Sequence, residues 1–201
     1  MRLLLASGSG HKVAELRRIL AAEHVDVDVV GVADVAPYPE PVEDGRTFED
    51  NALIKARAGF ARTGLATLAD DSGLEVDVLN GMPGVRSARW AGGHGHDGDN
   101  LALLLRQIDD VPPERRTARF VAAMALVWGG GETVVRGVVE GRLATVPRGE
   151  RGFGYDPVFV PDGQALTTAE MTDAAKDAIS HRGRALRAMI PHIVALAGEG
   201  S

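Results

Sequence analysis

The chain has 201 residues, of which 45% are hydrophobic, and its lack of cysteine excludes disulfides and thiolate metal sites. A formal charge of -6 at pH 7 disfavours a general nucleic-acid-binding surface. No apolar run approaches membrane-spanning length, and the run at residues 3–6 is too short for a signal peptide. We therefore expect one compact, soluble α/β domain in the cytoplasm, without nucleic-acid or membrane partners.

The first predicted element is an apolar strand at residues 2–6, which leads into a turn of small residues at 7–12. A helix is predicted next, because Val13 and Leu16 begin an apolar pattern at helical spacing. This order forms a candidate anion site, since the first helical N–H groups are unpaired and Lys12 adds a positive charge. The alternative is a plain helix entry, because the spacing of a Walker loop is absent.

A second strand is predicted at residues 25–32, and a proline-rich irregular segment follows it. The next predicted helix covers residues 47–62, where Thr47 and Asp50 have the spacing of a capping box. Gly64 is expected to end this helix.

Asn51 and Lys55 lie one turn apart on one face of that predicted helix. One interpretation is a solvated face. The other is that Lys55 points at the same anion as Lys12 and that Asn51 orients it.

Residues 65–73 indicate a short apolar strand that ends in Asp70 and Asp71, followed by a turn at Ser72 and Gly73. Two neighbouring carboxylates at the end of a buried strand are unfavourable unless a cation or hydrogen bonds compensate them. Adjacent strand residues point to opposite faces, so the two acids should have different functions unless the turn twists them together. A divalent metal would compensate the charge; a polar turn is the alternative interpretation.

Residues 74–78 are predicted to form a half-buried strand, and residues 101–108 a helix with buried leucines that Asp97 or Asp99 would cap. Two long strands, at residues 117–128 and 132–143, are joined by three glycines. Strands of this length predict a sheet that extends as a second lobe or a dimer surface.

A glycine-rich loop at residues 149–157 carries Phe153 and Tyr155 in a chain with few aromatics. The glycines leave the Phe153 ring free to stack on a flat group, whereas the alternative is a buried turn that the aromatics anchor. The tail is predicted to be helical over residues 168–197, with a break near Ser180 and a kink or restart at Pro191.

Three lysines with several acids suit magnesium-assisted attack on a phosphoanhydride, and an aromatic ring with a His-Arg pair suits a nucleotide base. In combination, the motifs resemble the inosine triphosphate pyrophosphatases, also called non-canonical purine nucleoside triphosphate pyrophosphatases, over essentially the whole chain. The motifs are Ala6-Ser7-Gly8 with Lys12 and Glu15, Thr47-Phe48 with Asn51, Ala52 and Lys55, the stretches 69–74, 83–84, 87–89 and 152–157, and Ser180-His181-Arg182-Gly183.

The resemblance implies an α/β fold with an elongated central mixed β-sheet flanked by helices, forming a single domain at residues 1–201 with two lobes and a substrate cleft. It implies hydrolysis of a purine nucleoside triphosphate to the monophosphate and pyrophosphate, with preference for deaminated bases such as hypoxanthine and xanthine. It also implies dependence on Mg²⁺ and a homodimer.

The resemblance further implies roles for individual residues. The substrate-binding residues would be Ser7, Gly8, Ser9, Gly10, His11, Lys12, Lys55, Ser72, Phe153, Gly154, Tyr155, Asp156, Lys176, His181 and Arg182. Glu43 and Asp71 would hold magnesium, Asp71 would be the catalytic proton acceptor, and Asp70 is a further candidate ligand. Because magnesium lowers the pKa of a carboxylate ligand and weakens it as a base, we expect Asp71 mainly to orient a metal-bound water, with Asp70 as its possible partner. The family usually has Asn where this chain has Ser9, whose side chain lacks an amide donor.

Two other functions remain as alternatives. A septum-formation-type nucleotide pyrophosphatase also begins with Leu-Ala-Ser, here at residues 5–7, but its usual Ser-Pro-Arg-Arg continuation is missing. A nucleotide-binding regulator without turnover is disfavoured by the intact acids Glu43, Asp70 and Asp71.

Overall fold

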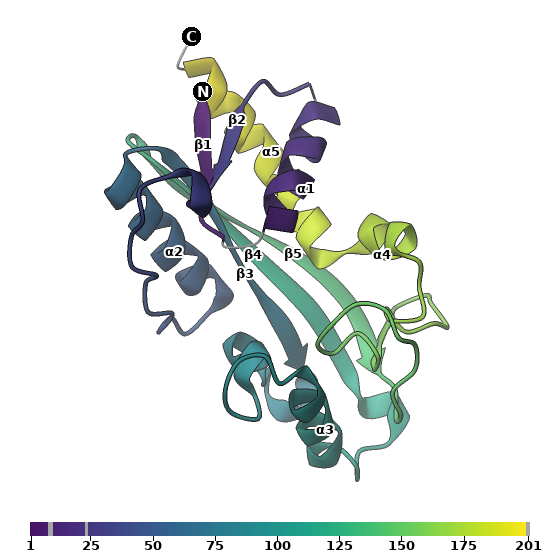
Figure 1. Cartoon of the computed structure of the whole chain (residues 1–201). Helices are drawn as coiled ribbons and strands as arrows, with labels where there is room; N and C mark the ends of the chain where they lie inside the picture. Colours follow the sequence, from purple (N-terminus) through teal and green to yellow (C-terminus); the bar gives the residue numbers. More distant parts are fainter. Residues whose placement is uncertain (8–9, 23, 200–201) are drawn as a thin grey trace. The chain divides into compact units, whose positions relative to one another are not determined.

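A computed structural model describes residues 1–7, 10–22 and 24–199, and its strands form one six-stranded sheet in the order β2-β1-β3-β4-β5-β6 (Figure 1). The strands are β1 (Arg2–Leu5), β2 (Asp28–Gly31), β3 (Ala66–Val76), β4 (Thr117–Trp128), β5 (Gly131–Leu143) and β6 (Phe159–Pro161). The α-helices are α1 (Gly10–Ala22), α2 (Phe48–Thr63), α3 (Asp97–Gln107), α4 (Asp173–Ile179) and α5 (His181–Glu199). β1 pairs in parallel with β2 and β3, whereas β5 and β6 are antiparallel, so the expected mixed sheet is confirmed.

The chain divides into two compact units. The first comprises Met1–Asp71, Ala123–Arg136 and Ala185–Ser201, and the second comprises Ser72–Ala122 and Gly137–Arg184. The strands β3, β4 and β5 therefore each contribute residues to both units. Within β3, the division falls between Asp71 and Ser72.

In the first unit, helix α2 approaches β1 and β3 closely at a glycine. A Cβ atom on Gly59 would lie 2.7 Å from Thr67 Cγ2 and 3.1 Å from Leu4 Cδ2. A residue larger than glycine would therefore push α2 away from these strands. In the parallel register, Leu4 of β1 lies opposite Thr67, and the Ala6 N–H donates to the Leu68 carbonyl at 2.8 Å. The carboxyl end of β1 therefore lies beside the first residues of β3, and the residues that follow β1 are neighbours of the acids in β3.

Helix α2 begins and ends as predicted. The Thr47 hydroxyl accepts from the Asp50 N–H at 3.1 Å, and the Asp50 carboxylate accepts from the Thr47 N–H at 3.1 Å, which completes the capping box. Gly64 ends the helix in the left-handed conformation, with φ of 69°. These local bonds define where α2 begins and ends, without contacts from distant residues.

The turn predicted at Ser72 and Gly73 is wrong, because β3 continues through both acids to Val76. Gly73 is a point of close approach instead. A Cβ atom there would lie 2.4 Å from Ser87 Oγ and 2.8 Å from the Gly84 carbonyl oxygen. A glycine inside a strand therefore marks a neighbouring segment here and not the end of the strand.

The second unit contains its own hydrophobic core, which includes Leu74, Leu104, Tyr155 and Phe159. The predicted long strands are confirmed as β4 and β5. Helix α3 starts four residues earlier than predicted, and its N-cap is His96 without a side-chain hydrogen bond, so capping by Asp97 or Asp99 is wrong.

Two other predicted elements differ from the structure. The strand predicted at residues 25–32 is shorter, since β2 is Asp28–Gly31. The break near Ser180 is confirmed between α4 and α5, but α5 runs without a restart through Pro191.

Among the described residues, no helix has the length and apolar character needed to cross a membrane.

Candidate functional site

In the first unit, one lysine lies between two acids. Lys55 Nζ, on α2, is 3.3 Å from Glu43 Oε1 and 3.6 Å from Asp71 Oδ1, on β3. Only 14% of the Lys55 side chain is exposed, so the interpretation of a solvated helix face is wrong for this residue. A single positive charge therefore brings together two carboxylates that lie far apart in the sequence. We call Glu43, Lys55 and Asp71 the charged triad.

Asn51 connects Asp71 of the triad to the backbone after Glu43 through the two ends of its amide. Its Nδ2 donates to Asp71 Oδ2 at 3.0 Å, and its Oδ1 accepts from the Gly45 N–H at 2.9 Å. The residue is fully buried. Asn51 therefore contacts the acid and the turn after Glu43 directly, whereas one of the two interpretations of the sequence was that it orients Lys55.

Asp70 has a different partner from Asp71, as the alternation of a strand predicts. Lys12 Nζ, on α1, lies 2.8 Å from both carboxylate oxygens of Asp70. The Asp70 side chain is 4% exposed and that of Lys12 is 29% exposed. Each acid of the pair is thus compensated by a lysine from a different helix.

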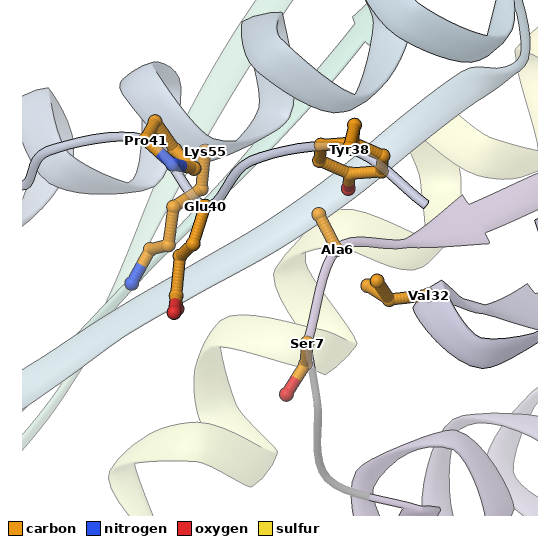
Figure 2. Close-up of a pocket in the computed structure, with 7 residues that line it drawn as sticks. All are labelled: Ala6, Ser7, Val32, Tyr38, Glu40, Pro41 and Lys55. Atoms are coloured by element: carbon orange, nitrogen blue, oxygen red, sulfur yellow. The ribbon is translucent and has the colours of Figure 1, made fainter. Parts of the chain in front are cut away.

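A cavity of about 280 Å³ lies beside the triad, and Figure 2 shows its lining side chains. Its walls are formed by Ala6, Ser7, Val32, Tyr38, Glu40, Pro41 and Lys55. Ala6 and Ser7 follow β1, and Val32 follows β2, so the cavity lies at the carboxyl ends of parallel strands, where α/β sheets commonly bind ligands. Burial, followed by the charge of Glu40, raises the pKa of Tyr38. Tyr38 and Glu40 were not predicted as site residues, because their proline-rich segment carries no motif that points to a function.

In the second unit, the aromatic loop presents one ring to solvent. Phe153 is 67% exposed, and Lys176 Nζ lies 5.3 Å from the centroid of its ring. The buried Asp156 carboxylate holds this arrangement together: it accepts from the Phe153 N–H at 2.8 Å, from Thr168 Oγ1 at 2.8 Å and from Lys176 Nζ at 2.5 Å. Phe153 is therefore an exposed ring on a fixed loop.

Tyr155 has the opposite environment. Its ring is buried in the core, and its hydroxyl donates to the Ser87 carbonyl at 2.9 Å. Burial, with a smaller effect of the Asp97 charge, raises the pKa of Tyr155. The neighbouring Gly154 N–H donates to Asp97 Oδ2 at 2.9 Å. Of the two interpretations of this loop, the free ring fits Phe153 and the buried anchor fits Tyr155.

Two residues at the start of α5, His181 and Arg182, each contact a strand residue. Arg182 Nη2 donates to Ser72 Oγ at 3.3 Å. The His181 ring stacks on Phe120, with centroids 5.0 Å apart and planes inclined by 16°. Phe120 was not predicted as a site residue, because its sequence context indicates only a long strand.

The predicted residues fall into two groups. The first unit contains Ser7, Lys12, Glu43, Lys55, Asp70 and Asp71, and the second contains Ser72, Phe153, Gly154, Tyr155, Asp156, Lys176, His181 and Arg182. Gly8 and Ser9 lie outside the described residues. Gly10 and His11 form the first two positions of α1, and their side chains lie outside the description.

The acids of the triad suit a magnesium ion that is shared with a phosphate substrate. Within the described part of the chain, no three Asp, Glu or His side chains lie close enough to form a metal site of their own. Mg²⁺ is usually bound by one or two carboxylates together with substrate phosphates and water. Glu43 and Asp71 supply two carboxylates that already share one cation, Lys55 Nζ.

A model of the Ham1 family matches residues 3–192. The chain is 62% identical over 198 residues to a Nocardia farcinica protein named dITP/XTP pyrophosphatase, and the match covers 98% of this chain and 96% of that protein. It resembles the crystal structure of the nucleoside-triphosphatase, or dITP/XTP pyrophosphatase, of Mycobacterium abscessus with a TM-score of 0.83 at 56% identity, covering 95% of this chain and all of that one. For the Ham1 protein of Staphylococcus aureus the TM-score is 0.89 at 34% identity, over 99% of this chain and all of that one.

Proposed function

Because this chain belongs to the Ham1 family, we propose that it hydrolyses the non-canonical purine nucleoside triphosphates ITP, dITP and XTP to the monophosphate and pyrophosphate, and so removes deaminated purines from the nucleotide pool. The observation that carries the proposal is the charged triad, in which Glu43 and Asp71 share one lysine beside a cavity. A polyphosphate with a divalent cation is the ligand class that suits such a mixture of charges.

The phosphates are assigned to the cations of the first unit. Lys55 and Lys12 both lie on helices, both are partly exposed, and both neutralise acids in the structure. A bound triphosphate competes with those acids for the ammonium groups. Ser7 follows β1 and adds a hydroxyl at the cavity wall.

Glu43 and Asp71 would hold Mg²⁺, which would supply positive charge to the phosphate oxygens as negative charge develops on them. That Asp70 is a further metal ligand stays a prediction. In the structure both of its carboxylate oxygens are bonded to Lys12. We propose that Asp70 instead positions Lys12 for the phosphates.

The reaction is a displacement at the α-phosphorus. A water oxygen bonds to that phosphorus, the bond from the α-phosphorus to the α,β-bridging oxygen breaks, and pyrophosphate leaves with that oxygen. The Asp71 carboxylate orients the water and takes its proton, and Asn51 Nδ2 holds the carboxylate in place through Oδ2.

The base is assigned to residues of the second unit. Phe153 offers an exposed face for stacking, and His181 and Arg182 offer N–H groups that suit the oxygen on a 6-oxo purine. An adenine amino group would leave such donors unpaired, at a cost of about 1–3 kcal/mol for each mismatched contact. The Tyr155 side chain is committed to the core, so its substrate contact is assigned to the main chain.

The test is product analysis with Mg²⁺ and ITP, dITP, XTP, GTP, ATP and dTTP in H₂¹⁸O, followed by ³¹P NMR. We expect pyrophosphate from ITP, dITP and XTP, little reaction with ATP, and ¹⁸O in the monophosphate, because water attacks the α-phosphorus. An Asp71→Asn preparation made in parallel controls for contaminating phosphatases. Orthophosphate as the first product, or preference for dTTP, refutes the proposal, and the latter favours the septum-formation-type pyrophosphatase. Tight binding without turnover favours the regulator.

The proposal includes a cytoplasmic homodimer, on the basis of the family resemblance. Light scattering on a size-exclusion column measures the mass against 21.2 kDa for one chain. Cell fractionation tests the compartment.

A further inference from the structure

We propose that Asn51 is a positioning residue for the hydrolysis, because one buried amide fixes both acids of the charged triad at once. The inference rests on the proposed function, since it concerns how the two carboxylates are held for that reaction. Asn51 does not contact the substrate in this scheme. It acts through Asp71 and through the turn that carries Glu43.

The amide is fixed in one orientation by its two partners. Its oxygen faces an N–H group, that of Gly45 at 2.9 Å, and its NH₂ group faces a carboxylate oxygen of Asp71 at 3.0 Å. A flipped amide would place oxygen against the carboxylate and NH₂ against the N–H, which is unfavourable at both ends. Because the side chain is fully buried, water cannot replace either bond.

The backbone that carries Asn51 is itself well fixed. Asn51 lies in the first turns of α2, directly after the capping box, and its own N–H donates to the Thr47 carbonyl at 3.2 Å. Lys55 follows one helical turn later on the same face. One face of α2 therefore sets three positions: Lys55 by its own backbone, Asp71 through the Asn51 amide nitrogen, and the Glu43 turn through the amide oxygen.

Gly45 offers a second, independent way to disturb the same contact. A Cβ atom at this position would lie 2.5 Å from Asn51 Oδ1, 2.6 Å from Asp50 Cβ and 2.9 Å from the Asn51 nitrogen. Each distance is shorter than real Cβ atoms adopt, so an alanine must displace the turn from the amide. The close approach itself explains why this turn contains glycine directly after Glu43 and Asp44.

The experiment compares Asn51→Leu, which removes both hydrogen bonds, with Asn51→Asp, which keeps the acceptor for Gly45 and loses the donor to Asp71. We expect kcat for dITP to fall about 100-fold in both, since a misplacement of about 1 Å costs a factor of this size, while KM changes less than threefold. Gly45→Ala should lower kcat similarly. Hydrogen exchange of the backbone amide at position 45, corrected for the intrinsic rate of the residue there, should accelerate in Asn51→Leu and Gly45→Ala and stay slow in Asn51→Asp.

Asn100 provides a matched control. It is 1% exposed, its Oδ1 accepts from the Ala91 N–H at 2.6 Å, and its Nδ2 donates to the Ala88 carbonyl at 3.3 Å. Asn100→Leu should lower the melting temperature like Asn51→Leu but keep the kcat of wild type. Gly98→Ala, whose new methyl group would enter open space, controls for Gly45→Ala.

Three results would overturn the inference: a kcat of Asn51→Asp within threefold of wild type, an equal loss of kcat in Asn100→Leu, or unchanged protection of the amide at position 45 in Gly45→Ala. Should Asn51→Leu not fold, Asn51→Asp and Gly45→Ala still decide the question. A wild-type enzyme without turnover of dITP and XTP defeats the proposed function, and the exchange of Gly45 then still shows separately whether the amide holds the turn.

Discussion

Replacing Gly73 with alanine should destabilise the protein strongly, although alanine is normally tolerated in strands. The added Cβ would lie 2.4 Å from Ser87 Oγ and 2.8 Å from both Ser87 Cβ and the Gly84 oxygen. Ser87 cannot retreat without cost, because its hydroxyl accepts from the Leu74 N–H at 2.9 Å and donates to the Gly84 carbonyl at 2.6 Å. Overpacking costs about 1–3 kcal/mol, and a net hydrogen bond adds about 1 kcal/mol. We expect a loss of about 2–4 kcal/mol in the free energy of unfolding.

Urea denaturation followed by circular dichroism measures this loss. Gly98→Ala is the control, because it lies in helix α3 with open space around the new methyl group and should be neutral or stabilising by up to about 1 kcal/mol. Ser87→Ala should cost less in the Gly73→Ala background than in wild type, since the clash has already broken the same hydrogen bonds. A Gly73→Ala protein within about 0.5 kcal/mol of wild type would refute the reasoning.

Three further predictions concern charged and titrating groups. Asp71→Asn should lower kcat about 10³-fold or more at an unchanged melting temperature, and steady-state turnover near the wild-type rate would remove its assigned role. Lys55→Ala should raise KM for dITP about 10- to 100-fold, with a smaller loss of kcat, because a charged hydrogen bond is worth about 1.5–3 kcal/mol; an unchanged KM would contradict phosphate binding. Burial raises the pKa of Tyr155 above its ordinary value of 10.0, so folding favours the protonated phenol; this stabilisation is complete below that pH and declines above it. Urea titrations should therefore show wild type losing about 1.4 kcal/mol more per pH unit than Tyr155→Phe above pH 10, and parallel losses would contradict the shift.

Features determined by neighbouring residues could be predicted from the sequence. Thr47, Asp50 and Gly64 carry their own hydrogen-bonding and conformational preferences, so both ends of α2 were predicted correctly. The hairpin of β4 and β5 was likewise predicted, because two long β-rich segments flank a run of glycines. The substrate assignment depended on motif resemblance and not on such local rules.

Features determined by distant residues could not be predicted. Gly73 in a polar segment has the local signature of a turn, and only Ser87, fourteen residues later, shows that it is a close contact inside a strand. The lysine that pairs with Asp70 could not be predicted for the same reason, because Lys12 is 58 positions away in the sequence. Periodicity places a side chain on a face but does not say which helix covers that face.

The acid pair shows how far the physical argument from sequence extends. Strand alternation correctly separated Asp70 from Asp71, and the cost of burying both correctly required compensating cations or hydrogen bonds. The structure supplies these from the protein itself, through Lys12 on α1 for one acid and through Lys55 and Asn51 on α2 for the other. Folding therefore does not require a metal to offset these charges. We therefore expect Mg²⁺ to bind together with the substrate. The phosphates would attract the lysines, and Glu43 and Asp71 would then share a new cation.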